Sequence, residues 1–321
     1  PLNVPGQLFP FASPMKLPVI TVLTAFLALA IPASAHEGAS TAMNANPLLT
    51  PSTLPAQFPR FDLIREEHFI PAYEQGMNEQ LQEVEAIVRN AQPATFENTI
   101  VALERSGQTL NRVAAIFDNL SSTISNEKMQ QIETEMAPRL SAHRDAIRLN
   151  PALFARIRAL FDTQAQLGLE AESARLLDRY YKDFARAGAL LPDSGKTRLI
   201  TLNAELASLL TAFTQNVLKE KNADGLVVAT REELAGLSDA EIQAAATAAN
   251  DAGHPGKYLL RLLNTTGQPP LSSLTHRPTR ERLMQASLAR GSHGGDYDNR
   301  AVVARIAAIR AELAALLGYE N

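Results

Sequence analysis

The sequence predicts a mainly α-helical protein, a multi-helix bundle with one small β element. Apolar residues recur every three or four positions over most of the chain after residue 60, which is the spacing of a buried helix face. The joints between these periodic segments are short, as they are between antiparallel helices of a bundle. Only residues 225–266 contain apolar runs of the β type, GLVVAT and KYLLRLL.

Composition bounds the classes of function. The chain has 321 residues, of which 45% are apolar and 20% are charged, so it can form more than one subdomain of an ordinary soluble type. The net charge is only −4, and no basic patch with interleaved aromatic residues is present. We therefore expect no nucleic-acid partner. Cysteine is absent, which excludes disulfides, cysteine-ligated metals and thiol catalysis.

The front of the chain indicates export. Met15 and a lysine precede the apolar run Leu17–Ile31, and Ala33 and Ala35 form a small-residue cleavage signature. These features predict a secretory signal peptide from Met15 to Ala35 and a periplasmic or secreted protein without stable membrane association after cleavage. A retained anchor helix is the alternative interpretation. Residues 1–14 are expected to be upstream and unstructured.

The next segments are a proline-rich, extended lead over residues 36–60 and an amino-terminal helical domain over residues 61–221. Thr95 is a predicted helix N-cap, and Pro138 is expected to kink or interrupt its helix. The predicted helices of this domain cover residues 61–90, a single long helix from Thr95 to about residue 120, and residues 126–149, 151–161, 172–187 and 192–219.

Residues 222–270 are expected to form a small connecting α/β segment. The runs 225–230 and 256–266 are predicted to pair as a small sheet, with a helix over residues 240–252 between them. Two capping boxes are predicted there, one from Thr230 and Glu233 and one from Ser238 and Glu241.

Two helices are predicted in residues 271–321, the first from about Thr279 to Arg290 and the second after Asp298 and Asn299 as N-caps. A glycine-rich GSHGG loop separates them. The second helix has a buried face at steps of four and three residues. That face consists of Val302, Ile306, Ile309, Leu313 and Leu316, and the opposite face is expected to carry Arg305, Arg310 and Glu312.

Few side chains are arranged for chemistry. His293 lies beside Asp296 and Asp298, so a metal site in the GSHGG loop is one hypothesis, and caps within a flexible loop are the other. His254 is expected to be exposed in a turn. The helical residues His68 and His143 are expected to be solvated or half-buried.

A basic cluster surrounds the first of the two terminal helices. A peptide carboxylate could bind there, although a solvated face or pairing within the chain is the simpler interpretation. The cluster consists of Arg277, Arg280, Arg282 and Arg290.

Four segments in a fixed order resemble one family. They are the lead NPLLTPSTLP, the string TFENTIVALERSG, the segment REELAGLSD, and the terminal pair TRERL and DNRAVVARIAAIRAELAALLGYEN. Together they resemble the M3 family of zinc metallopeptidases, most strongly its bacterial peptidyl-dipeptidases and then the oligopeptidase A type. The similarity spans about residues 46–321.

The resemblance implies a thermolysin-like oligopeptidase with a deep channel between helical halves. It implies zinc bound by an H-E-x-x-H motif, which polarises the scissile carbonyl and activates water while the motif Glu acts as general base. Family members of this type release dipeptides from the C-terminus of oligopeptides. The sequence contains no H-E-x-x-H, since only His36 is followed by Glu, and position 40 is Ser.

We therefore expect the amino-terminal part of a zinc peptidyl-dipeptidase, with residues 271–321 as the start of its catalytic domain. Catalytic and zinc-binding residues are expected to lie beyond Asn321, and this chain alone is expected to be inactive. The expected partners are oligopeptide substrates, and the expected state is a monomer. The alternative is a non-catalytic helical domain that binds peptides or partner proteins.

Overall fold

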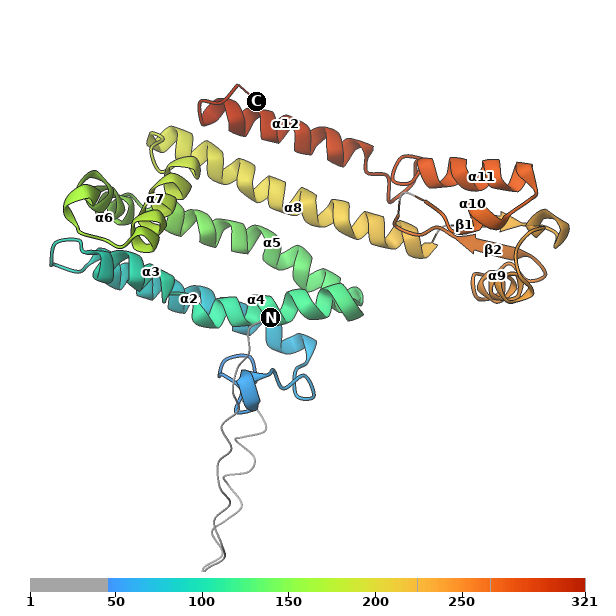
Figure 1. The fold of residues 1–321 in the computed structure, drawn as a ribbon, viewed down its shortest axis with the longest axis horizontal. Helices are drawn as coiled ribbons and strands as arrows, with labels where there is room; N and C mark the ends of the chain where they lie inside the picture. Colours follow the sequence, from blue (N-terminus) through green and yellow to red (C-terminus); the bar gives the residue numbers. More distant parts are fainter. Residues whose placement is uncertain (1–45, 224, 266, 321) are drawn as a thin grey trace, which may run out of the picture. The chain divides into compact units, whose positions relative to one another are not determined.

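The computed structural model describes residues 46–321 except for residues 224, 266 and 321 (Figure 1). The predicted signal peptide Met15–Ala35 and the upstream residues 1–14 lie outside the described residues. Within the described part, no helix is both long and apolar enough to cross a membrane.

The described chain is mainly helical, as predicted, with one two-stranded sheet. Short 3-10 turns lie at Pro55–Gln57 (η1), Glu66–His68 (η2), Gln164–Gln166 (η4) and Glu232–Leu234 (η5), and a π-helical segment lies at Phe96–Val101 (η3). The strands are β1 (Gly225–Val228) and β2 (Tyr258–Arg261). The α-helices are α2 (Phe69–Val88), α3 (Ala102–Glu104), α4 (Gln108–Ile124), α5 (Glu127–Arg148), α6 (Pro151–Asp162), α7 (Ala171–Arg186), α8 (Asp193–Ala223), α9 (Asp239–Asp251), α10 (Pro270–Ser273), α11 (Arg277–Leu288) and α12 (Arg300–Leu316).

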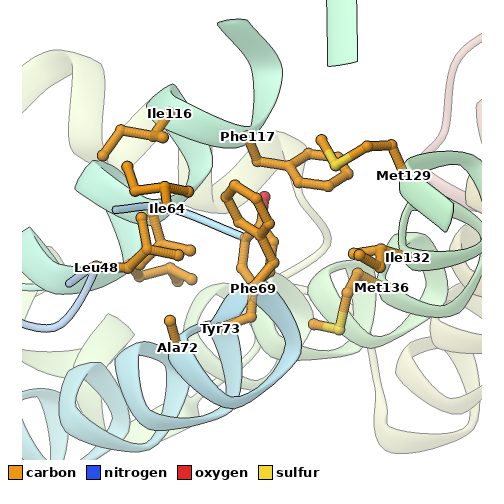
Figure 2. Close-up of a cluster of buried hydrophobic side chains, with 12 residues drawn as sticks. Leu48, Ile64, Phe69, Ala72, Tyr73, Ile116, Phe117, Met129, Ile132 and Met136 are labelled. Carbon is orange, nitrogen blue, oxygen red and sulfur yellow. The ribbon is translucent and has the colours of Figure 1, made fainter. Parts of the chain in front are cut away.

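A first core lies where α2 packs against α4 and α5 (Figure 2). The ring of Phe117 meets Phe69 and Tyr73 edge-on, with centroids 5.1 and 5.8 Å apart. Such pairs add stabilisation beyond the burial of their area. Leu48 in the lead is fully buried in the same cluster, which ties the residues before α2 to the bundle.

A second core joins the end of α2 to η3, α3, α6 and α7. Phe161 stacks on Tyr181 at 3.9 Å between ring centroids, and Phe154 stacks on the same tyrosine at 5.7 Å. Helices α6 and α7 begin and end within two residues of their predicted limits. Their periodicity was therefore sufficient to locate them.

A third core is built on the sheet, α9, α10 and α11. The strands pair antiparallel with Gly225 opposite Arg261 and Val228 opposite Tyr258, which confirms the predicted pairing. The capping box at the start of α9 is also confirmed: Ser238 Oγ accepts from the Glu241 amide at 3.3 Å, and the Ser238 amide donates to the Glu241 carboxylate at 2.8 Å.

The other predicted capping box is wrong. After Thr230 the chain forms only the 3-10 turn η5, which follows Arg231 without a side-chain cap. Glu233 instead accepts from Arg282 of α11 at 3.0 Å. A carboxylate that has a guanidinium partner on another helix is not available to the local backbone.

The single long helix predicted from Thr95 is also wrong, although Thr95 is the N-cap and its hydroxyl accepts from the Asn98 amide at 3.1 Å. The helix breaks before α4 at Gly107, whose φ of 73° is left-handed. The Gly107 amide donates to Glu83 of α2 at 2.7 Å. The left-handed φ favours glycine, and a Cβ at this position would lie 2.4 Å from Gln80 Nε2, so a larger residue would also require the Gln80 side chain to move.

Pro138 does not interrupt its helix, because α5 is continuous from Glu127 to Arg148. An interior proline costs about 3 kcal/mol of helix stability. Helix α5 packs on both α2 and α8, and these contacts outweigh the lost hydrogen bond.

Helix α8 lies between α5 and α12 (Figure 1). Ile306 and Ile309 of the predicted buried face of α12 are buried, whereas Val302, Leu313 and Leu316 of the same face are only half-buried. Arg305 and Glu312 do not lie on a separate solvent face, because both reach across to α8. Their long side chains extend from the flanks of the apolar stripe, where the charged groups stay in contact with water.

Candidate functional site

A cavity with a volume of about 800 Å³ lies among the helices near the C-terminal end of the described chain. Its walls are the second half of α8, the start of α12, the end of α11 and the residues that follow β2. Most of the lining is apolar, with Phe213 and Val217 on one side and Leu288 and Val303 on the other. We call it the α8–α12 cavity. Leu288 is 71% exposed and Val303 is 48% exposed, so the cavity opens to solvent through apolar side chains.

A buried carboxylate supports the loop that closes one end of this cavity. Glu220 of α8 is only 4% exposed. Its two oxygens accept from the Gly291 amide at 2.7 and 2.8 Å, and His293 Nε2 lies 2.6 Å from Oε1. Gly291 has a φ of 68°, a backbone conformation that favours glycine. The carboxylate thus fixes the GSHGG loop at the end of α11.

The end of the same loop is fixed by Asn299 and Asp298. Asn299 is buried, its side chain donates to the Phe213 carbonyl at 3.2 Å, and it accepts from Asn216 at 3.0 Å. Asp298 accepts from the amides of Arg300 and Gly294 at 2.9 and 2.8 Å. The Arg300 guanidinium beside it holds the pKa of the Asp298 carboxyl well below its usual range. The loop is therefore a braced connection between α11 and α12.

The arrangement of side chains in this loop does not support the hypothesis of a metal site. His293 is engaged with Glu220, while Asp298 is engaged with Arg300 and its neighbours. Over residues 46–321, with the three gaps named above, no three His, Asp or Glu side chains converge to hold a metal ion. A zinc site needs about three such ligands. The described residues of this chain therefore do not fit the zinc ion that the family resemblance implies.

The remaining histidines have local roles. His68 is half-buried and its Nδ1 accepts from the Arg65 amide at 3.0 Å. His254 is exposed, as expected for its turn. His276 Nδ1 lies 2.7 Å from Thr279 Oγ1 at the start of α11. Within the described residues, none of these histidines belongs to a group of three potential metal ligands.

His143 is a correction, because it is buried at 6% exposure and not half-solvated. Its Nε2 lies 2.7 Å from Gln80 Oε1 of α2, so that nitrogen carries the proton. Its Nδ1 has no hydrogen-bond partner in the described structure. Burial, with a contribution from nearby Arg144, lowers the pKa of His143. The charge-rich sequence around it gave no sign of a neighbour on another helix.

Two of the four arginines in the basic cluster around α11 have partners within the chain. Arg282 pairs with Glu233 and donates to the Val227 carbonyl at 2.8 Å. Arg290 donates to the carbonyls of Thr265 and Ser287 at 2.7 and 2.9 Å. These two arginines connect α11 to the residues around the sheet, as the simpler interpretation anticipated.

Sequence reasoning missed Glu220. Phe213, Val217 and Glu220 follow one another at steps of four and three, so that Glu220 lies on the same face of α8 as two apolar residues. A carboxylate that continues an apolar stripe is expected to have a partner, and this signal was available in the sequence.

The site lies in a helical chain that resembles the M3 metallopeptidases, and comparison with known proteins confirms that resemblance. No family model matches the chain. The chain is 42% identical over 279 residues to the dipeptidyl carboxypeptidase of Salmonella typhimurium, covering 87% of this chain and 41% of that protein.

Two further relatives support the same assignment. The dipeptidyl carboxypeptidase of Escherichia coli is 40% identical over 276 residues, covering 86% of this chain and 40% of that protein. The oligopeptidase A of Escherichia coli is 29% identical over 280 residues, with the same coverage of 86% and 40%. The chain thus spans about 40% of the length of these relatives, and its similarity to the dipeptidyl carboxypeptidases exceeds its similarity to this oligopeptidase A.

Proposed function

We propose that this chain forms the amino-terminal helical part of a secreted, zinc-dependent peptidyl-dipeptidase that hydrolyses oligopeptides and releases dipeptides from their C-terminus. One observation carries the proposal: 42% identity to a dipeptidyl carboxypeptidase over 87% of this chain. The similarity to an oligopeptidase A supports the broader class of peptide substrate. On this proposal the chain acts as a monomer and its partners are oligopeptides.

The contribution of this chain would be a wall against which a substrate or the rest of the enzyme packs. The α8–α12 cavity provides about 800 Å³ bounded by apolar side chains, and such surfaces bind apolar side chains of unfolded polypeptide. The buried Glu220 is engaged with the Gly291 amide and His293, so it positions the loop. Both of its carboxylate oxygens are engaged in these contacts, so neither is available to activate a water for hydrolysis.

The chain alone is expected to bind no stoichiometric zinc and to cleave no peptide. The sequence has no H-E-x-x-H, and the described residues form no cluster of three metal ligands. The test compares residues 36–321 with a fusion of these residues to the part of the Salmonella dipeptidyl carboxypeptidase that the comparison does not cover. Metal analysis and release of dipeptides from a model oligopeptide are measured for both.

We expect only the fusion to bind zinc and to release dipeptides in a chelator-sensitive way. A folded, zinc-loaded fusion that releases no dipeptide would contradict the proposed function. Chelator-sensitive turnover by residues 36–321 alone would show that the active site lies in this chain, with His293 and Asp296 the first residues to substitute.

Export is a separate part of the proposal. The apolar run after Met15 and the Ala33-x-Ala35 signature support cleavage after Ala35. Mass spectrometry of the exported protein is expected to find His36 at its N-terminus. A mature protein that retains Leu17–Ile31 would support the anchor interpretation instead.

A second candidate function is a non-catalytic domain that binds peptides or a partner protein. The exposed apolar residues Leu288 and Val303 at the cavity mouth favour it. The two candidates differ in the gene: an H-E-x-x-H in the reading frame after Asn321 supports the peptidase, and a stop codon there supports the binding domain.

A further inference from the structure

A second pocket, of about 300 Å³, lies among α5, α8, α12 and the end of α7. It shares no lining residue with the α8–α12 cavity. Its lining includes the buried Asp145 of α5 and the half-buried Asn203 of α8, which we call the floor, and exposed arginines, which we call the rim. Its volume is at the lower end of the range for small-molecule sites.

The floor contains an unsatisfied acceptor. Asp145 is 8% exposed, and one of its oxygens accepts from Asn203 Nδ2 at 2.9 Å. Its other oxygen, Oδ2, is buried and has no hydrogen-bond partner in the described structure. A buried polar atom without a hydrogen-bond partner destabilises the fold, and a charged one does so more strongly. Burial accordingly raises the pKa of the Asp145 carboxyl. Such an oxygen at the floor of a pocket indicates a donor that arrives with a ligand.

The rim has the opposite charge. Arg144, Arg148 and Arg186 line the pocket, and within the described residues none of their guanidinium groups forms a hydrogen bond or an ion pair. The charges of Arg144 and Arg148 act on Asp145 and lower its pKa, which opposes the effect of burial. Neither side chain donates a hydrogen bond to it. Three cations therefore remain available to an anion at the mouth.

Leucine side chains lie between floor and rim. Leu206 and Leu210 come from α8, and Leu313 and Leu317 come from the end of α12. An apolar group of the ligand would pack on them, because burial of apolar area is favourable in itself.

We propose that this pocket binds a short peptide with free termini, whose ammonium group donates to Asp145 Oδ2 and whose carboxylate pairs with the arginine rim. An apolar side chain of the peptide then lies on the leucines. A simple anion would leave the Asp145 oxygen without a donor, and a simple cation would be repelled by three guanidinium groups. A zwitterionic ligand pairs with both parts of the pocket, because its ammonium group meets Asp145 and its carboxylate meets the arginines, while it carries no net charge.

The choice of a dipeptide as the probe rests on the proposed function, whose product is a dipeptide. Binding is measured without turnover, so that failure of the site and failure of the peptidase proposal can be distinguished. The protein would be titrated by calorimetry with alanyl-leucine, with N-acetyl-alanyl-leucine, which lacks the ammonium group, and with alanyl-leucine amide, which lacks the carboxylate.

We expect alanyl-leucine to bind and both blocked peptides to bind on the order of tenfold more weakly or worse. Asp145→Asn is expected to weaken alanyl-leucine by a similar factor and to leave the acetylated peptide unchanged, because the acetylated peptide has no ammonium group to lose. Arg148→Gln is expected to weaken alanyl-leucine and to leave the amide unchanged. Asp118→Asn on α4 is the control for the loss of one negative charge, since Asp118 is an exposed carboxyl that lies outside the pocket.

Loss of folding is separated from loss of binding by circular dichroism and urea unfolding of each variant. Arg148 is exposed, so its substitution tests the rim without disturbing the core. Absence of alanyl-leucine binding up to about 10 mM by the folded protein would overturn the proposal. Equal binding of the free and the acetylated dipeptide would also overturn it, because the arginines would then form a plain anion site.

Discussion

At Gly76, helix α2 lies so near the backbone of α4 that there is no room for a side chain. A Cβ built at Gly76 would lie 2.8 Å from the backbone nitrogen and 2.9 Å from the Cα of Leu110. An ordinary contact between such atoms is about 3.5 Å or more, so Gly76→Ala requires α2 and α4 to separate by about 0.7 Å. Both obstructing atoms belong to the backbone, so no side-chain rotation can relieve the contact.

The change in the free energy of unfolding caused by Gly76→Ala is the difference between two opposing effects. Overpacking of a tight contact costs about 1–3 kcal/mol. Alanine favours the helix over glycine by about 0.8–1.0 kcal/mol. With the cost near its upper end, we expect Gly76→Ala to lower the free energy of unfolding by about 1–2 kcal/mol. For a urea dependence of about 2 kcal/mol/M, the midpoint would fall by about 0.5–1 M.

The assay is urea unfolding followed by circular dichroism, with Gly195→Ala in α8 as the matched control. A Cβ at Gly195 would meet its nearest atom, Leu191 Cβ, at 3.3 Å, and no backbone atom lies that close. The control is expected to be neutral or slightly stabilised. A Gly76→Ala protein as stable as the wild type would refute the reasoning, since it would mean that α2 and α4 separate without cost.

Three further predictions concern α12 and α5. Ile309→Ala removes a fully buried side chain and is expected to cost about 2–5 kcal/mol in urea unfolding, whereas Val303→Ala at the cavity mouth is expected to cost little. The pKa of His143 is below its ordinary 6.5 in the folded protein, so the unfolded state binds a proton more readily and stability falls as the pH drops below about 6.5. His143→Gln is expected to reduce this loss of stability at low pH. An unchanged dependence of stability on pH would contradict the prediction. The pKa of Asp145 is above its ordinary 3.8 in the folded protein, so stability falls as the pH rises above 3.8 until the carboxyl of the folded protein has ionised. Asp145→Asn is therefore expected to be more stable than the wild type at neutral pH. A lower urea midpoint of the variant at neutral pH would contradict the prediction.

Interactions between residues near one another in sequence could be predicted, whereas those between distant helices could not. Local signals placed Thr95 and Ser238 as caps, because a cap bonds to a backbone amide only three residues away. The break at Gly107 was missed because the apolar spacing continues across it. It depends on Glu83 and Gln80 of α2, which are distant in sequence.

In the candidate site, too, local features could be predicted from the sequence and contacts between helices could not. The glycine-rich loop was apparent from local sequence. Of the two predicted N-caps, Asn299 takes the N-cap position but its side chain bonds to α8 and not to the start of α12, and Asp298 accepts from the Arg300 amide instead. The partnership of Glu220 with Gly291 spans 71 residues, and that of His143 with Gln80 spans 63. Pairs of this kind form only when helices pack, so the spacing of residues along one helix cannot predict them.

The ion pairs between α8 and α12 have a consequence for how the helices are aligned. Arg198 and Glu205 are seven residues apart on α8, and Arg305 and Glu312 are seven apart on α12. In the antiparallel arrangement each guanidinium forms two hydrogen bonds with the opposite carboxylate, at 2.6–2.8 Å.

These exposed pairs add little stability, about 0–1 kcal/mol each. A slip of α12 by two turns would instead place Arg198 opposite Arg305 and Glu205 opposite Asp298, and a parallel arrangement would oppose arginine to arginine and glutamate to glutamate. Like charges placed opposite one another are unfavourable. The four residues thus determine the direction and register in which α12 docks, a choice that the repeating apolar stripe alone leaves degenerate.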